Sequence, residues 1–412
     1  MRTDIFHRKP DLSPDTLAYP PLFNELNAIS GGLSEITPEL AMELGYTVGE
    51  IAERVAVGYS DHSVCKLLAN AFIAGAGSSG VQITETDAGF FAAAAYIART
   101  FLFNLTVFFE NDGGRFRVRM IDKYGLPIER ELQRKIEFYA HRASFPRAGA
   151  ADTLMPKSIT GAREAFSLSA SKKGKFDGFA VSVIGKSAAT ESLRRALSAS
   201  GARVIPPKHG VVAFSVTDDG EKLCIRDEDE RWYDDGHTMA LLSLIHFSSG
   251  EQELAVPPSA PSVTEQIAAE FDGRILRIGR DSGAREIFVS QNVLTDAASS
   301  AVFLCAFLLQ TGDDVRRLMR QLPPFTLVSR EVTVSGDRRE VLSQLADGIC
   351  GTHKENMGEL RVCADGGWVN ISPSRSKSAL RVTGESINEE IASELCDLYI
   401  ERARAVDKTS HK

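Results

Sequence analysis

Runs of apolar, β-prone residues alternate with segments of helical spacing along most of this chain, in three successive stretches. The clearest stretch consists of strand 55–58, helix 64–76, strand 81–84, helix 88–100 and strand 105–110. Two later stretches repeat the pattern around strands 179–184 and 274–278. Strands that alternate with helices favour α/β units with parallel pairing. We therefore expect one internally repeated α/β architecture.

Changes in composition divide the chain into four expected domains. Their predicted ranges are 1–148 (with an irregular arm at 1–20), 149–254, 255–323 and 324–412. Segment 251–263 is rich in proline and serine and is expected to be a linker, and 286–290 is expected to be a strand. After 323–324 the pattern changes to antiparallel strands and a closing helix. The predicted fold class is α/β, with three repeated mixed α/β units plus a C-terminal α+β domain.

Composition narrows the classes of function. The formal net charge of −8 argues against a nucleic-acid-binding surface, because such a surface is basic. The six cysteines lie far apart without a C-x-x-C pair, which is typical of free thiols in a reducing compartment. The first residues contain no apolar signal segment, and the longest apolar run, 301–309, is too short to cross a bilayer. We expect a cytoplasmic protein that binds neither nucleic acid nor membrane.

Six phrases, in order, carry a resemblance to a known family. They are TPELAMELG at 37–45, VAVG at 55–58, LANAFIAGAGSSGVQI at 68–83, RMIDKYGLPIERELQRKIE at 119–137, KLCIRDEDERWYDDGHTMALL at 222–242 and WVNISPSRSKSALRVTGE at 368–385. With these phrases the chain resembles the α-D-phosphohexomutase superfamily (phosphoglucomutase, phosphomannomutase, phosphoglucosamine mutase) over roughly 22–406. The resemblance implies domains arranged around a central cleft. It also implies phosphoryl transfer by a serine nucleophile, Mg²⁺ on three aspartates, and a loop that grips the substrate's other phosphate.

The chain departs from this family where the nucleophilic serine is expected. An ungapped alignment back from Asp122 places the serine on Phe109, and an alignment on Thr106 places it on Phe108. A benzyl side chain cannot carry phosphate, so no catalytic residue is expected at this position. Of the family's serine motif only Asn111 remains.

The three metal ligands that the resemblance implies fall on Thr217, Asp219 and Glu221, and Lys222 replaces an arginine. This set could hold Mg²⁺ weakly, or it could be a plain acidic β-turn at the end of a strand. No other cofactor is expected. His62 lies in a loop where the family has arginine, and it is either a cleft residue that titrates near neutrality or a surface histidine.

The segment aligned with the family's phosphate-binding loop keeps more polar and cationic side chains than the other aligned sites do. Ser374, Arg375, Ser376 and Lys377 are candidates for binding phosphate, and a polar surface turn is the alternative. Between Ser290 and Thr295 the chain has no room for the sugar-recognition loop that the resemblance implies. The alternating arginines at 115, 117 and 119 share one face of a strand, which we expect to be solvated.

The sequence therefore favours a phosphohexomutase-like protein that has lost mutase catalysis and acts by binding. It would be a regulatory or partner subunit, in a homo-oligomer or in a hetero-oligomer with an active phosphohexomutase, with a sugar phosphate as its ligand. One alternative is an active, divergent hexose-phosphate mutase in which Ser60 or Ser63 acts as nucleophile near Asp219 and Glu221. Another is a purely structural subunit.

Overall fold

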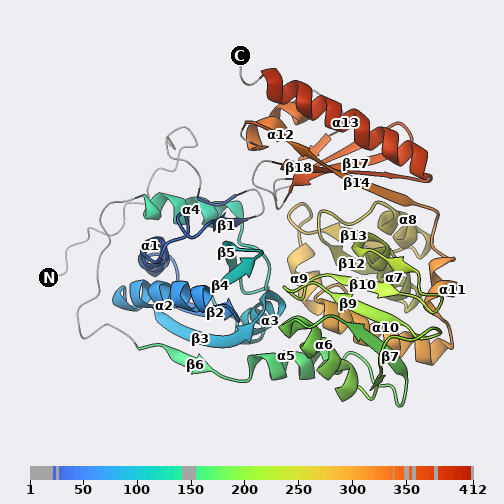
Figure 1. Cartoon of the computed structure of the whole chain (residues 1–412), viewed down its shortest axis with the longest axis horizontal. Helices are drawn as coiled ribbons and strands as arrows, with labels where there is room; N and C mark the ends of the chain where they lie inside the picture. Colours follow the sequence, from blue (N-terminus) through green and yellow to red (C-terminus); the bar gives the residue numbers. More distant parts are fainter. Residues whose placement is uncertain are drawn as a thin grey trace.

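The computed structural model describes seven parts of the 412-residue chain, namely 22–24, 27–141, 155–336, 338–347, 352–354, 359–374 and 379–409. These residues form four sheets, which define four domains in chain order. In Figure 1 the first domain lies on one side, the second and third lie together on the other, and the fourth lies above them. The predicted class of three α/β units followed by an α+β domain is confirmed.

The first domain is built on a six-stranded sheet with the order β1-β5-β4-β2-β3-β6. Its strands are β1 (Ala28–Gly31), β2 (Arg54–Ser60), β3 (Gln82–Gly89), β4 (Leu105–Asp112), β5 (Arg115–Ile121) and β6 (Lys157–Ile159). Its helices are α1 (Pro38–Gly49), α2 (Ser63–Ser78), α3 (Phe91–Phe101) and α4 (Arg130–Ala140). Strand β2 pairs in parallel with β3 and β4, and β5 pairs antiparallel to β4 and β1. Strand β6 joins this sheet although it lies after the expected boundary at 148.

Two glycines explain why helices α1 and α2 pack so closely. A Cβ atom at Gly45 would lie 2.3 Å from the carbonyl oxygen of Phe72, and one at Gly75 would lie 2.1 Å from that of Met42. Any side chain at either position would therefore force the helices apart. The glycine-rich phrase near position 75 thus serves helix packing. It lies inside α2 and does not form a phosphate-binding loop.

The second domain contains a five-stranded sheet with the order β11-β10-β9-β7-β8. Its strands are β7 (Ala180–Ile184), β8 (Arg203–Val204), β9 (Ala213–Val216), β10 (Leu223–Arg226) and β11 (Trp232–Tyr233). Its helices are α5 (Ala162–Ser171), α6 (Ala188–Ala199) and α7 (Asp235–Ser248). Strands β7, β8 and β9 are parallel, whereas β10 runs antiparallel to β9 and β11.

The third domain corrects two sequence predictions. Its elements are β12 (Glu253–Val256), α8 (Val263–Glu270), β13 (Arg274–Arg277), α9 (Ala284–Ser290), α10 (Ala297–Thr311) and α11 (Val315–Met319). The predicted linker 251–263 is wrong in its first half, because β12 pairs in parallel with β13. The predicted strand 286–290 is also wrong. Ala284 and Phe288 are both buried at the i, i+4 spacing of a helix, and Val289 is exposed, so helical packing outweighs the β-branched composition.

The fourth domain has an antiparallel sheet with the order β14-β18-β17-β16-β15. Its elements are β14 (Thr326–Thr333), α12 (Arg338–Asp347), β15 (Thr352–Lys354), β16 (Leu360–Ala364), β17 (Gly367–Pro373), β18 (Ala379–Ser386) and α13 (Glu389–Thr409). Helix α13 runs along one face of the sheet in Figure 1 and buries Leu395, Cys396 and Tyr399 in the core of this domain.

Separate apolar cores stabilise the domains. One core lies between the first sheet and helices α1 and α2, and another fills the fourth domain. The largest core combines helix α3 with the second and third domains, which makes these parts one packed body. Among the described helices, none combines the length and apolar character needed to cross a bilayer.

Candidate ligand-binding groove

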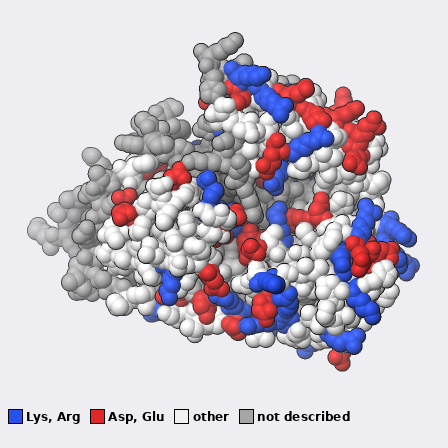
Figure 2. Space-filling view, in the orientation of Figure 1, with Lys and Arg blue, Asp and Glu red and all other residues white. Residues whose placement is uncertain are grey.

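A groove with a volume of about 420 Å³ lies where the four domains meet. Strand β5 contributes Arg117 and Arg119, and the second domain contributes Glu221, Lys222 and Asp235. The third domain contributes residues 259–261, and strands of the fourth domain form the remaining wall. Figure 2 shows acidic and basic side chains interspersed around the hollow of this face. The groove is thus the central cleft that the sequence predicted.

The segment expected to carry the family's nucleophile is a tight β-hairpin. Strands β4 and β5 are paired without interruption from Thr106 opposite Ile121 to Asp112 opposite Arg115. Only Gly113 and Gly114 form the turn, and their φ angles of 59° and 90° require the left-handed region. No loop therefore remains between these two strands that could carry a nucleophile into the groove.

Phe109 and Phe108 lie on opposite faces of strand β4. Phe109 is fully buried in the core beneath α2, where its ring packs edge-on against Phe72 at 5.9 Å. Phe108 is also fully buried, and its ring centroid lies 6.0 Å from that of Phe91. Neither ring lines the groove, so the groove is open and is not filled by these phenylalanines. The backbone N–H of Asn111 donates to Ser60 Oγ at 3.3 Å, and the side-chain oxygen of Asn111 accepts from Gly114 N, so this residue supports the hairpin.

The face of β5 that carries the arginines is turned toward the groove, and the prediction of a solvated face is wrong for two of them. The side chains of Arg117 and Arg119 are only 15% and 16% exposed. Arg117 lies 2.8 Å from the carboxylate of Glu110, and Arg119 donates two hydrogen bonds of 2.8 and 2.9 Å to Glu221. Burial raises the pKa of Glu110. Burial alone would lower the pKa of Arg119, but Glu221 and Glu110 together hold it above its usual value.

The acidic segment 217–222 forms a closed turn. Gly220 N donates to the carbonyl oxygen of Thr217 at 2.8 Å, and Thr217 Oγ1 donates to Asp219. The carboxylate of Glu221 faces Arg119 instead. In the part of the chain that the structure describes, no three or more His, Cys, Asp or Glu side chains gather as metal ligands. Of the three implied ligands, Thr217 and Asp219 bond each other, and Glu221 bonds Arg119. Mg²⁺ binding at this turn stays a prediction.

Lys222 and Asp235 form a second ion pair at the groove, with a nitrogen–oxygen distance of 3.0 Å. Asp235 begins helix α7, and Asp234 caps that helix by accepting from His237 N. Burial raises the pKa of Asp235, whereas the carboxylate of Asp235 raises the pKa of Lys222. The pair fixes the position of the Lys222 ammonium on one wall of the groove.

The other predicted site residues that the structure describes do not line the groove. Ser374 is 2% exposed, and its hydroxyl donates to Glu331 at 2.6 Å. Arg375, Ser376 and Lys377 lie outside the described residues. His62 is exposed at the start of α2, where Nδ1 accepts from Val64 N at 3.3 Å. Ser60 accepts from Asn111 N, and neither Ser60 nor Ser63 lines the groove.

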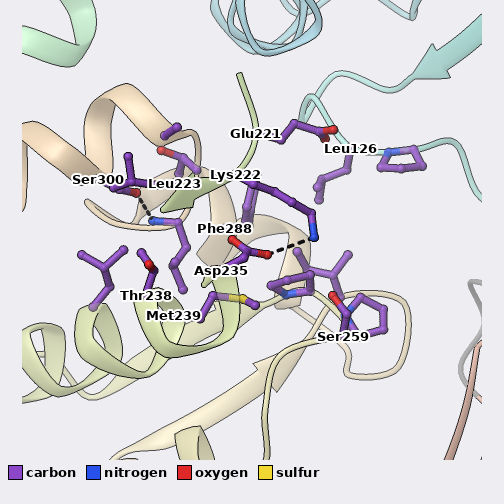
Figure 3. Close-up of a pocket in the computed structure, with 18 of the residues that line it drawn as sticks. Leu126, Glu221, Lys222, Leu223, Asp235, Thr238, Met239, Ser259, Phe288 and Ser300 are labelled. Carbon is purple, nitrogen blue, oxygen red and sulfur yellow. Dashed lines mark hydrogen bonds and ion pairs between the residues drawn. The ribbon is translucent and has the colours of Figure 1, made fainter. Parts of the chain in front are cut away.

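An apolar chamber of about 290 Å³, which sequence reasoning missed, opens beside the groove (Figure 3). Its apolar wall is formed by Leu126, Leu223, Met239, Leu242, Ile278 and Phe288. These side chains come from three domains, and each one fits a core position of its own helix, strand or loop. No local pattern in the sequence therefore distinguishes them from ordinary core residues.

The loop at 257–262 borders both the chamber and the groove, and two buried arginines hold it in place. Arg277 donates 2.9 Å hydrogen bonds to the carbonyl oxygens of Pro258 and Ala260. Arg361, from the fourth domain, donates to the same Ala260 oxygen at 2.9 Å and to Ser262 Oγ. Arg277 is fully buried and also pairs with Glu265. This border is therefore a rigid part of the structure.

The four domains and the groove between them define a protein of the phosphohexomutase fold. A structure of a phosphoglucomutase/phosphomannomutase family protein from Burkholderia thailandensis matches 93% of this chain and 98% of its own, with a TM-score of 0.68 and 14% identity. The open form of pp63/parafusin (phosphoglucomutase) from Paramecium matches 95% of this chain and 96% of its own, with a TM-score of 0.60 and 10% identity. The predicted resemblance is thus confirmed for the fold, and such low identities show the fold alone.

Sequence comparisons match a smaller part of the chain than the structural comparisons do. No family model matches the chain. A curated protein from Methanopyrus kandleri, named "Probable phosphoglucosamine mutase", is 22% identical over 176 residues. That match covers 38% of this chain and 39% of the relative, so the chain spans about two fifths of the curated relative that it matches. The activity of that relative is not transferred to this chain.

Proposed function

We propose that this chain binds a hexose phosphate in its central groove without transferring the phosphoryl group, and that it acts as a regulatory or partner subunit. The observation that carries the proposal is the hairpin of β4 and β5. Mutase chemistry needs a nucleophilic hydroxyl on a loop at the groove, and here seven consecutive residue pairs close the corresponding segment into a sheet. Binding does not need that loop, and the groove is open.

The polar lining of the groove supports a sugar ligand. Its described cations are Arg117, Arg119, Lys222, Arg361 and Arg381, and its described carboxylates are Asp219, Glu221, Asp234, Asp235, Glu359 and Glu385. Fixed carboxylates accept hydrogen bonds from sugar hydroxyls, and arginines donate hydrogen bonds to sugar and phosphate oxygens. The groove volume of about 420 Å³ lies within the range of small-molecule sites.

The fourth domain is the side on which we place the phosphate. Arg381 on β18 lines the groove, is 47% exposed and pairs with Glu331 at 3.1 Å. A partly exposed arginine can exchange a carboxylate partner for a phosphate at low cost. A subunit that responds to a sugar phosphate in this way would report it to a partner, either a second copy of the chain or an active phosphohexomutase.

Two measurements test the proposal. The chain is incubated with radiolabelled glucose 1,6-bisphosphate and Mg²⁺ beside an active phosphoglucomutase, and its intact mass is recorded. We expect no covalent label. Calorimetry with glucose 6-phosphate is expected to show binding that weakens at least fivefold in Arg381→Met. The control Arg195→Met removes a similarly exposed, ion-paired arginine of helix α6, and we expect no change.

The same experiment decides the alternatives. Stable phosphoserine on this chain would overturn the proposal and support a divergent mutase with a rebuilt site. The position of Ser60 disfavours that reading, because its Oγ accepts from Asn111 N outside the groove lining. Absence of binding to any hexose phosphate would also overturn the proposal and would favour a purely structural subunit.

A further inference from the structure

We propose that the chamber beside the groove receives an aromatic group attached to the ligand's sugar. The ligand class is therefore an aryl-substituted hexose phosphate, with its polar part in the groove and its ring in the chamber. This inference rests on the proposed function, because that proposal places the sugar phosphate in the groove. The inference adds the aromatic group, which a simple hexose phosphate lacks.

The chamber has the size and lining for one aromatic ring. An apolar protein cavity of about 150 Å³ stays dry and holds benzene. This chamber measures about 290 Å³, and Met239, Leu242 and Phe288 line it. In Figure 3, Met239 and Phe288 lie close to the Lys222–Asp235 ion pair. A hydroxyl-rich sugar would lose hydrogen bonds to water on such a wall, whereas an aromatic ring would gain by leaving water.

The groove and the chamber adjoin each other and share part of their walls. The seven residues that line both are Arg119, Glu221, Lys222, Asp235, Met239, Ser259 and Glu359. Four of them form the ion pairs Arg119–Glu221 and Lys222–Asp235, which lie at the border between the polar and the apolar space. A molecule that crosses this border needs a polar end and an apolar end. This is why we infer a single amphiphilic ligand instead of two separate ones.

A short connection between α9 and α10 keeps the chamber open. The segment 291–296 is the place where the sequence has no room for a sugar-recognition loop. Gln291 is 5% exposed, and its amide bonds both the N–H and the carbonyl of Ala255. At the other end Asp296 caps α10 by accepting from Ser299 N at 2.8 Å. Because both ends are fixed, Leu294 and Thr295 line a chamber that exists before any ligand binds.

Calorimetry with two ligands that share one sugar phosphate tests the inference. Glucose 6-phosphate and 4-nitrophenyl β-D-glucoside 6-phosphate are titrated into the full chain. We expect the aryl compound to bind at least tenfold more tightly, because its ring leaves water in the chamber. Met239→Phe and Leu294→Phe, two variants that fill the chamber, are expected to bring the affinity ratio close to one. Leu294 is only partly buried, so at least this variant should fold, as circular dichroism will verify.

The matched control is Met42→Phe, because this methionine is 37% exposed on α1 and does not line the chamber. Its affinity ratio should stay at tenfold or more. Equal affinities in the wild-type chain, or a ratio that neither filling variant lowers, would overturn the inference. If glucose 6-phosphate does not bind at all, the proposed function fails, and benzyl alcohol then tests the chamber alone. In a saturation-transfer NMR experiment, a signal from benzyl alcohol that the filling variants abolish would support an aromatic site in the chamber. The absence of a signal with the wild-type chain would overturn that site.

Discussion

Arg119 on β5 donates two hydrogen bonds, 2.8 and 2.9 Å long, to the carboxylate of Glu221, and thereby joins the first domain to the second at the groove. The same guanidinium lies over the ring of Phe91. The side chain of Arg119 is 16% exposed and that of Glu221 is 40% exposed. A guanidinium with so little access to water depends on this partner, because water cannot replace the lost carboxylate. The pair therefore contributes a hydrogen-bonded contact between the two domains at the groove.

We expect Glu221→Gln to lower the free energy of unfolding by about 1–2 kcal/mol. Breaking a fully buried pair costs about 3–5 kcal/mol, and the partial exposure of Glu221 reduces that cost. Urea denaturation measures the change. The control is Glu164→Gln, whose pair with Arg195 is about half exposed on both sides, and it should change stability by less than about 0.5 kcal/mol. Equal losses in the two variants would show that Arg119 does not depend on Glu221.

Placing a serine at the aligned family position should not create a phosphorylated residue. Phe109→Ser removes a fully buried ring that packs against Phe72 at 5.9 Å, so we expect a loss of about 3–4 kcal/mol in unfolding free energy. The new hydroxyl would lie in the core beneath α2, away from the groove. Mass spectrometry after incubation with glucose 1,6-bisphosphate should find no phosphate on it.

A matched control for this substitution is Phe101→Ser, because Phe101 is 44% exposed at the end of α3. We expect a loss below about 1 kcal/mol. Phosphorylation of the serine in Phe109→Ser would show that the hairpin opens in solution, and it would contradict our description of the groove.

The sequence predicted the elements whose signals are local. Thr37, which precedes Pro38 in the sequence, caps α1 by accepting from Leu40 N, and Gly113 and Gly114 form the turn that follows the predicted strand 105–110. Prediction failed where tertiary packing decides the structure. The segment with Ile287 and Val289 has strand-like composition but forms α9, because Ala284 and Phe288 pack at helical spacing.

The candidate site was predicted less well than the fold. Alignment placed Phe109 at the site of the nucleophile, but it could not show that the strand continues and turns this side chain into a core. Lys222, which the alignment placed at a family arginine, lines the groove. Its partner Asp235 is distant in sequence and was not predicted. Pairings of this kind depend on how a strand and a helix pack in three dimensions, which periodicity and spacing do not encode.

Acidification should weaken the fold through His246. This side chain is 3% exposed, and its Nε2 donates to the carbonyl oxygen of Glu253 at 2.9 Å. Burial lowers the pKa of His246 below its ordinary value of 6.5. Below that pH the unfolded chain therefore binds a proton that the folded chain does not bind, and stability falls as the pH falls. One such group contributes at most about 1.4 kcal/mol per pH unit.

The measurement compares wild-type protein with His246→Gln, in which the glutamine amide can still donate to the carbonyl of Glu253. Between pH 7.5 and 5.5, urea denaturation should show a smaller loss of stability in the variant. His209→Gln, at an exposed position, is expected to follow the wild-type slope. If His246→Gln keeps the full wild-type slope, other groups cause the acid sensitivity.

Glu385 on β18 docks the fourth domain onto the third by capping helix α8. Its carboxylate accepts from Ser262 N at 2.7 Å, from Ser262 Oγ at 2.9 Å and from Val263 N at 3.0 Å. An anion at a helix N-terminus satisfies free N–H groups and interacts favourably with the helix dipole. We expect Glu385→Gln to lower the free energy of unfolding by about 1–3 kcal/mol. A neutral amide makes weaker hydrogen bonds than a carboxylate, and its NH₂ group would face a donor of Ser262 or Val263.

Hydrogen exchange detects this loss of docking directly. In Glu385→Gln the amides of Ser262 and Val263 should exchange at least tenfold faster, while those of β12, inside the third domain, stay protected. The control is Glu390→Gln, an exposed position at the start of α13 in the same domain, where we expect no change. Arg361 still bonds Ala260 and Ser262 in both variants, so docking weakens without complete release. Unchanged exchange at Val263 would show that Arg361 alone holds the two domains together.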